Sequence, residues 1–295
     1  MLFGDQPPVW GGVFTRFEDP DRNSFALISL DEVSRAIEQR RRTIAAKLES
    51  ERRAAHELEI AKQVQARLFP QVMPAVSTLE YAGICIQARE VGGDYYDFLG
   101  LGPGHLGFAL ADIAGKGIAA ALIMANLQAN LRTQSTIAWL EPQRFLQSVN
   151  DLFYENTAES VYASLFFGIY DDQTRSLRYA NCGHLCALLL RDDGELERLD
   201  STCTVMGLFR EWNCSLAECS LFAGDTLALY TDGVTESFND DGEEFGERRL
   251  IDALRQYCKL PPQEMVNSIV NEVRRFSSRE QHDDITLMIA RGRDG

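Results

Sequence analysis

The sequence lacks any long apolar run. Its most apolar stretch, Ala119–Met124, is far shorter than the roughly 18 residues that a membrane-spanning helix needs. The first ten residues contain neither a basic region nor an apolar core, which a secretory leader would require. Internal repeats and low-complexity segments are also absent from the sequence. We therefore expect a folded, cytoplasmic chain that does not enter a membrane.

Positive charge is scarce. The 295 residues include 29 lysines and arginines against 44 aspartates and glutamates, so the net charge is −15. Proteins that bind nucleic acid present a basic surface to the phosphate backbone, and a nucleic-acid partner is therefore not expected. Abundant carboxylates can instead hold divalent cations.

The cysteines lack the spacing of a metal or redox motif. All seven are scattered without a CxxC pair, and neither Cys182–Cys186 nor Cys214–Cys219 has zinc-finger spacing. We interpret them as mostly buried thiols in a reducing compartment.

Proline and glycine are missing from Asp31 to Phe69, where charges of both signs alternate. This pattern predicts one long helix that stops at Pro70. A heptad seam of apolar residues runs along it: Val33, Ile37, Ile44, Ala54, Leu58, Ala61 and Leu68. Four polar residues interrupt the seam: Arg40, Lys47, Glu51 and Gln65. The helix either lies solvated on its own domain or forms a weak coiled coil that makes a homodimer.

The chain divides into three predicted parts. Residues 1–30 form a loop-rich arm, residues 31–70 the long regulatory helix, and residues 71–295 a globular domain. Strands are predicted at Tyr81–Ala88, Leu106–Asp112, Ser164–Tyr170, Ser176–Asn181, Leu185–Arg191, Asp225–Thr231 and Ile285–Ala290. Helices are predicted at Ile118–Arg132, Pro142–Asn156, Glu247–Tyr257 and Pro262–Phe276. Because strands mostly neighbour strands, the class is α+β with layered sheets.

Four acidic sites lie at strand ends or tight turns of this domain: Asp94, Asp112, Asp232 and the pair Asp283–Asp284. Any one of them fits ordinary Asp-Gly turn chemistry. An aspartate at the end of an apolar strand is nevertheless costly to desolvate without a positive partner. If the strands converge, the four sites make a cluster of hard oxygen ligands suited to magnesium or manganese.

Several segments resemble the signature blocks of one family. EVGGDYYDF, ADIAGKGIAAALIMANLQANLR, YTDGVTESFNDDGEEFG and DDITLMIAR look like those of the SpoIIE/RsbU-type serine/threonine phosphatases, the bacterial branch of the metal-dependent type-2C phosphatases. The similarity covers roughly Glu59 to Arg291, with the blocks in the expected order. It implies two antiparallel sheets sandwiched between helices, with a two-metal site at one edge.

The resemblance also implies roles for individual residues. The metal ligands of two manganese or magnesium ions would be the catalytic carboxylates Asp94, Asp112, Asp232 and Asp283 and the carbonyl of Ile113. Asp112 would bridge the ions.

Other residues have supporting or open roles. Asp97 and Asp284 are expected to support the ligands. Arg89 is a candidate for binding phosphate, and Lys116 either does the same or caps its helix. His184 is either a proton donor or a residue that orders its loop.

The function implied is hydrolysis of a phosphoprotein by water activated between the two ions. Relatives in this family act on small phosphorylated STAS-type anti-anti-sigma proteins in partner-switching pathways. The alternative is a non-catalytic module with the same fold that only docks to such a partner. Loss of a metal carboxylate would favour that alternative, and all four are present.

Overall fold

The computed structural model describes every position except 1, 7–11, 31, 159, 278–280 and 295. The chain divides into two units, Met1–Ile60 and Ala61–Gly295, which are described separately. The helix α1 (Glu32–Ala66) begins in the first unit and ends in the second, so the predicted long helix is confirmed. No helix in the described part of the chain is both long and apolar enough to span a membrane.

The N-terminal 30 residues differ from the expected loop-rich arm. They contain an antiparallel sheet of β1 (Leu2–Gln6), β2 (Gly12–Glu18) and β3 (Ser24–Leu30), with positions 1 and 7–11 outside the described residues. The polar segment after β2 is a hairpin turn, in which the Asn23 amide donates to Asp19 Oδ1 at 2.8 Å. Phe17 stacks on Phe25 across this hairpin. The sequence favours a loop here because its turn-forming residues are conspicuous, whereas the short strands beside them show little alternation of apolar and polar residues.

The second unit contains two five-stranded sheets, in which every pairing is antiparallel. One sheet has the order β10-β9-β12-β13-β4 and the other β11-β8-β7-β6-β5. The strands are β4 (Leu79–Ile86), β5 (Tyr95–Gly102), β6 (His105–Ile113), β7 (Ala163–Asp171), β8 (Ser176–Cys182), β9 (Ala187–Leu190), β10 (Leu196–Leu199), β11 (Ala217–Ser220), β12 (Thr226–Tyr230) and β13 (Ile285–Gly292). The helices are α2 (Ile118–Ala138), α3 (Pro142–Asn156), α4 (Asp232–Thr235), α5 (Gly246–Tyr257) and α6 (Pro262–Phe276). The predicted fold class is confirmed, although the strands β5, β10 and β11 were not predicted.

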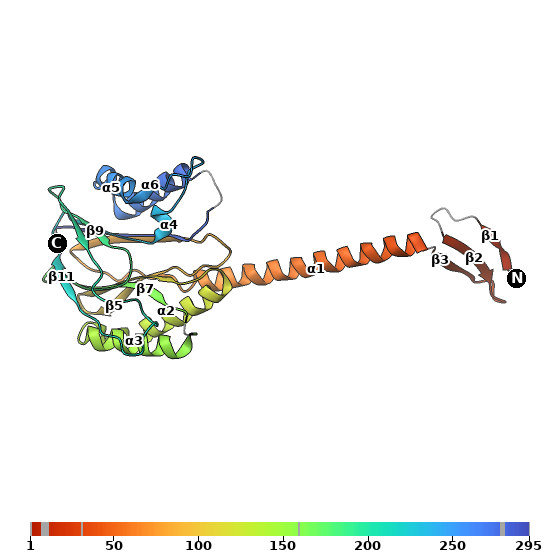
Figure 1. Cartoon of the computed structure of the whole chain (residues 1–295), viewed down its shortest axis with the longest axis horizontal. Coiled ribbons are helices and arrows are strands. Elements are labelled where there is room, and N and C mark those ends of the chain that lie inside the picture. Colours follow the sequence, from red (N-terminus) through yellow and green to blue (C-terminus); the bar gives the residue numbers. More distant parts are fainter. Residues whose placement is uncertain (1, 7–11, 31, 159, 278–280, 295) are drawn as a thin grey trace. The chain divides into compact units, whose positions relative to one another are not determined.

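The sheets and helices stack in four layers (Figure 1). A core that includes Phe108, Phe166 and Leu229 lies between the two sheets. Helices α2 and α3 pack on the outer face of the sheet containing β5 and β6, around residues such as Phe145 and Leu127. Helices α5 and α6 cover the other sheet. This arrangement leaves the strand ends at the edge of the sandwich free to carry polar groups.

One ion pair ties α2 to β5. Asp97, whose side chain is fully buried, accepts hydrogen bonds from Arg132 Nε at 2.7 Å and from Arg132 Nη2 at 2.8 Å. The Tyr95 hydroxyl donates to the same carboxylate. Tyr95 and Asp97 lie on the same face of β5 because side chains alternate along a strand. Asp97 therefore points toward α2, where its carboxylate binds Arg132 and Tyr95.

We expect Arg132→Ala to lower the free energy of unfolding by about 2–4 kcal/mol, because it leaves a buried carboxylate without its cation. Urea denaturation measures this loss. The control is Arg144→Ala, which removes a pair with Glu141 in which both side chains are more than half exposed. The control should cost no more than about 0.5 kcal/mol. Equal losses in the two variants would contradict the importance of the Asp97 pair.

Candidate metal centre

The four aspartates predicted as ligands lie at strand ends on one edge of the sandwich. Asp94 directly precedes β5 and Asp112 lies near the end of β6, and the pairing of Tyr95 with Ala111 makes the two aspartates neighbours. In the other sheet Asp232 follows β12, and Asp283 precedes β13, the strand that pairs with β12. The two sheets thus contribute two aspartates each.

Asp94 is the most deeply buried member of the group, with 2% of its surface exposed. Its Oδ2 accepts hydrogen bonds from the hydroxyls of Thr231 at 2.7 Å and Thr286 at 2.5 Å. Burial, followed by repulsion from Asp112 and Asp284, raises the pKa of Asp94 well above its usual value. The sequence analysis did not predict a role for either threonine. Thr231 directly precedes Asp232, and Thr286 follows Asp284 by two positions.

Neighbouring aspartates also raise the pKa values of Asp112 and Asp232. Burial and the negative charges of Asp232, Asp283 and Asp284 raise the pKa of Asp112 to about 7. Burial, then Asp283, raises the pKa of Asp232. Carboxylates that repel each other in this way favour a bound cation, because the cation replaces repulsion with attraction.

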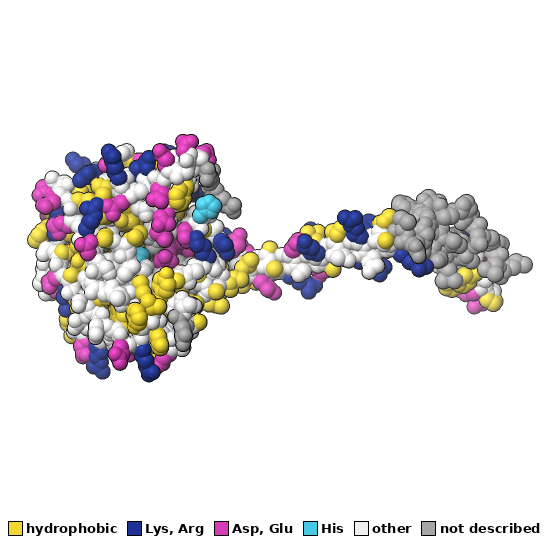
Figure 2. All heavy atoms as spheres, in the orientation of Figure 1, with side chains coloured by type: hydrophobic (Ala, Val, Ile, Leu, Met, Phe, Trp, Pro, Cys, Tyr) yellow, Lys and Arg dark blue, Asp and Glu magenta, His cyan; other side chains and the backbone are white. Residues whose placement is uncertain are grey.

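Two cations border the carboxylates. Lys116 Nζ lies 2.6 Å from Asp283 Oδ2 and donates to the His282 carbonyl at 2.9 Å. A cavity of about 10 Å³ is lined by Arg89 and Lys116 together with Asp112, Asp283 and others, and it has room for about one water. Figure 2 shows acidic and basic side chains interspersed over the surface of this unit. The cavity therefore brings both predicted phosphate-binding cations to the carboxylates.

Glycines allow the backbone to approach closely around Asp284. A Cβ at Gly92 would lie 1.9 Å from Asp284 Oδ2, and one at Gly233 would lie 2.0 Å from the Asp284 carbonyl oxygen. Asp284 in turn accepts the backbone amide of Ala88 at 2.8 Å and that of Asp94 at 3.3 Å. The Asp284 carboxylate therefore holds the loop that carries Asp94. Gly92 and Gly233, which have no side chain, leave room for Asp284.

The predicted backbone ligand, Ile113, ends β6 with its side chain completely buried. A Cβ at Gly93 would lie 3.1 Å from the Ile113 carbonyl oxygen. The carbonyl therefore faces the glycine pair that precedes Asp94.

His184 is held as a structural residue. Its Nδ1 lies 2.7 Å from Ser164 Oγ and its Nε2 lies 3.1 Å from the Tyr230 carbonyl oxygen. A carbonyl only accepts, so Nε2 carries the proton and Nδ1 accepts from Ser164. Burial lowers the pKa of His184 to about 4, which keeps the ring neutral. Of the two roles considered, this geometry favours ordering of the loop.

Gln65, at the end of α1, does more than interrupt the heptad seam, because its side chain binds the Gly92 backbone. Only 4% of its surface is exposed, and its amide binds both polar groups of the Gly92 backbone. Nε2 donates to the Gly92 carbonyl at 2.8 Å, and Oε1 accepts the Gly92 amide at 3.1 Å. The end of α1 thus forms hydrogen bonds with the loop two residues before Asp94. No heptad pattern could have indicated this, because the partner lies 27 positions away.

The donors fit hard divalent cations. Among the described residues, no three carboxylates have oxygens that all lie within 4.8 Å of one another. Magnesium is commonly held by only one or two carboxylates and keeps several waters, so a site for it does not need three carboxylate oxygens close together. The buried, mutually repelling carboxylates are the observation that supports such a site.

Comparison with known proteins gives a consistent picture. A family model described as Stage II sporulation protein E (SpoIIE) matches residues 102–293. Phosphoserine phosphatase RsbU of Bacillus subtilis (strain 168) is 28% identical over 237 residues, which cover 80% of this chain and 70% of RsbU.

Solved structures show the same fold. The SiaA-PP2C domain of Pseudomonas aeruginosa superposes with a TM-score of 0.70 at 21% identity, covering 82% of this chain and 97% of that domain. The catalytic domain of the serine/threonine phosphatase PstP, solved with two manganese ions, has a TM-score of 0.57 at 18% identity and covers 74% of this chain and 99% of that domain.

The carboxylate cluster predicts an unusual pH dependence for the metal-free chain. The pKa of Asp112 is about 7 in the folded chain and near 3.8 when unfolded. Between these values the folded chain holds a proton that the unfolded chain has released, so stability falls as pH rises. From pH 6.5 to 8.5 we expect the free energy of unfolding in chelator to drop by about 1 kcal/mol.

The comparison variant is Asp112→Asn, which should lose this decrease and be at least as stable as wild type at pH 8.5 in chelator. His184 does not interfere with this measurement. Its lowered pKa makes the free energy of unfolding rise with pH only between about 4 and 6.5, below the range from pH 6.5 to 8.5. Asp252→Asn, on the exposed side of α5, should keep the wild-type slope. Identical slopes for wild type and Asp112→Asn would show that Asp112 is not held among like charges.

Proposed function

This chain belongs to the SpoIIE family, and from that premise we propose that it is a metal-dependent protein serine/threonine phosphatase. The observation that carries the proposal is the convergence of aspartates from both sheets on one edge, where burial and then the neighbouring negative charges raise the pKa of Asp112 to about 7. The named activity of the relative RsbU and the manganese ions in PstP support it.

Asp94, Asp112, Asp232 and Asp283, with the Ile113 carbonyl, would hold two divalent ions, either manganese or magnesium. When bound, such ions lower the pKa of a water and neutralise charge on the phosphoryl oxygens. Thr231 and Thr286 keep the Asp94 carboxylate in one orientation.

Phosphate recognition falls to the two neighbouring cations. Lys116 lies against Asp283 and is about half exposed, so it can turn toward an incoming phosphate. Arg89 is exposed and its Nη1 lies close to Gly117, just before α2. Together they would orient the phosphoryl group over the carboxylates.

The proposed substrate is a phosphorylated STAS-type protein. The support is the family resemblance together with the relative RsbU, which is named a phosphoserine phosphatase. A non-catalytic docking module would need none of the metal carboxylates, whereas this chain keeps all four on one edge.

Activity should depend on metal and on Asp232. With an aryl phosphate as substrate, wild type should hydrolyse it in manganese or magnesium and lose activity in chelator. Asp232→Asn should lower kcat/KM by about 100-fold or more, because a ligand to the ions loses its charge. Asp252→Asn serves as the control and should remain as active as wild type. Full activity of Asp232→Asn in saturating manganese would rule out the proposed centre.

We also propose that α1 mediates homodimerisation. In a single chain the seam residues Ile37 and Ile44 are 56% and 58% exposed, which a partner helix would cover. The side chain of Val33 lies outside the described residues. Gln65 is excluded from this seam because it binds Gly92.

Replacing Arg40, Lys47 and Glu51 with leucine should strengthen the dimer, because the polar interruptions of the seam become apolar. Analytical ultracentrifugation of the full chain measures the dimerisation constant. Leucine at Arg42, Glu49 and His56 on the opposite helix face is the matched control and should not strengthen it. A triple seam variant that stays monomeric would contradict the coiled-coil proposal.

A further inference from the structure

Three cysteines converge near the end of β8, outside the carboxylate cluster. Within the described part of the chain, Cys182, Cys203 and Cys214 form the one group of three cysteine, histidine or acidic side chains whose ligand atoms all lie within 4.8 Å of one another. The sulfurs of Cys203 and Cys214 are 3.0 Å apart. Their sequence spacing gave no sign of this, because the fold, and not a local motif, brings the three segments together.

The three cysteines come from one strand and one irregular segment. Cys182 is fully buried at the end of β8. Cys203 lies opposite it in an isolated parallel bridge, and Cys214 follows eleven positions later in the same irregular segment. Both partly exposed cysteines pack against the apolar core beneath α2 and α3. A buried strand end and two positions of one irregular segment thus bring their sulfur atoms together.

The three cysteine sulfurs are suitable ligands for a soft metal ion. Hydrogen bonds with Cys182 and Cys214 lower the pKa of Cys203 to about 3, which favours metal binding because metals bind the deprotonated sulfur. Thiolates bind zinc and copper(I) in preference to hard cations. A disulfide would use only two of the three sulfurs and would leave the third without a role.

We propose that Cys182, Cys203 and Cys214 form a three-thiolate site for a soft metal ion such as zinc. Sulfurs bound to one zinc at about 2.3 Å lie about 3.8 Å apart in tetrahedral geometry. The Cys203–Cys214 pair therefore has to open by less than about 1 Å, which an irregular segment can accommodate. The Ser215 carbonyl lies 3.4 Å from Cys203 Sγ and 3.7 Å from Cys214 Sγ, so a fourth oxygen donor is close at hand.

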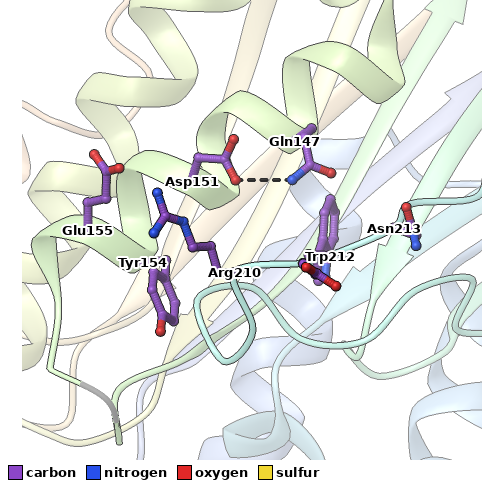
Figure 3. A pocket seen from close by; sticks show the side chains of 8 residues that line it. Gln147, Asp151, Tyr154, Glu155, Arg210, Trp212 and Asn213 are labelled. Atoms are coloured by element: carbon purple, nitrogen blue, oxygen red, sulfur yellow. Dashed lines mark hydrogen bonds between the residues drawn. The ribbon is translucent and has the colours of Figure 1, made fainter.

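Such an ion would pin both ends of the segment between Cys203 and Cys214. This segment carries Arg210, Trp212 and Asn213, which line a groove of about 720 Å³ against α3. Figure 3 shows Arg210 extending toward the α3 side chains Asp151 and Tyr154 across this groove. The segment has no helix or strand of its own, so a metal staple would fix the groove wall.

The test is metal binding by the reduced full chain. Cobalt(II) bound by thiolates gives a strong near-ultraviolet charge-transfer absorption that carboxylate-bound cobalt lacks, and zinc displaces it in competition. We expect one such cobalt per chain. Cys203→Ser and Cys214→Ser should each bind cobalt at least about 10–100-fold more weakly than wild type. A loss of that size already follows when only a hydrogen-bond partner of a metal ligand is removed. Binding should release protons and weaken as the pH falls.

The control is Cys258→Ser, at the end of α5 and outside the cluster, which should bind like wild type. Far-ultraviolet circular dichroism checks that each variant is folded, and Cys182→Ala tests the buried ligand separately. Absence of the thiolate band from reduced wild type would overturn the proposal. So would a band that persists in Cys203→Ser and Cys214→Ser, or a Cys203–Cys214 disulfide that forms while no metal binds.

Discussion

The burial of several negative charges at one edge of a β-sandwich governs this structure. Desolvating carboxylates is costly, and placing them beside one another adds repulsion to that cost. Asp94, which is buried, and Asp112, which is half-buried, show the result, since both have a raised pKa. Apolar packing in the three cores has to offset this local penalty. The carboxylates at this edge therefore repel one another, and a bound cation would relieve that repulsion.

The surrounding structure keeps these charges in place. Hydroxyls from β13 and from the end of β12 hold Asp94, and Lys116 pairs with Asp283. The Gly92 backbone sits between the Asp284 carboxylate and the Gln65 amide, so it is fixed from both sides. The polar ends of the two sheets act as one framework because each sheet supplies partners for the carboxylates of the other.

Much of this was predictable from the chain, and the failures have physical causes. The blocks around Asp94, Asp112, Asp232 and Asp283 carry strong local patterns, and the fold class follows from the same segments. The strand β5 was missed because glycines before and within it resemble turn signals. The direction of Asp97 depends on strand phase, which a motif does not define. The cluster of Cys182, Cys203 and Cys214 depends on tertiary contact alone, as does the partner of Gln65.

The position of β13 has a consequence for how the protein acquires its fold during synthesis. This strand lies between β12 and β4 in its sheet, and its pairing joins Leu79 to Gly292 across most of the chain. Contacts so distant in sequence form slowly, because a long loop has to close first. A nascent chain that has emerged only as far as α6 therefore exposes two unpaired strand edges, which invite association with other chains. Asp283 and Asp284 arrive with the missing strand, so the carboxylate edge is completed in the same late step that closes the sheet.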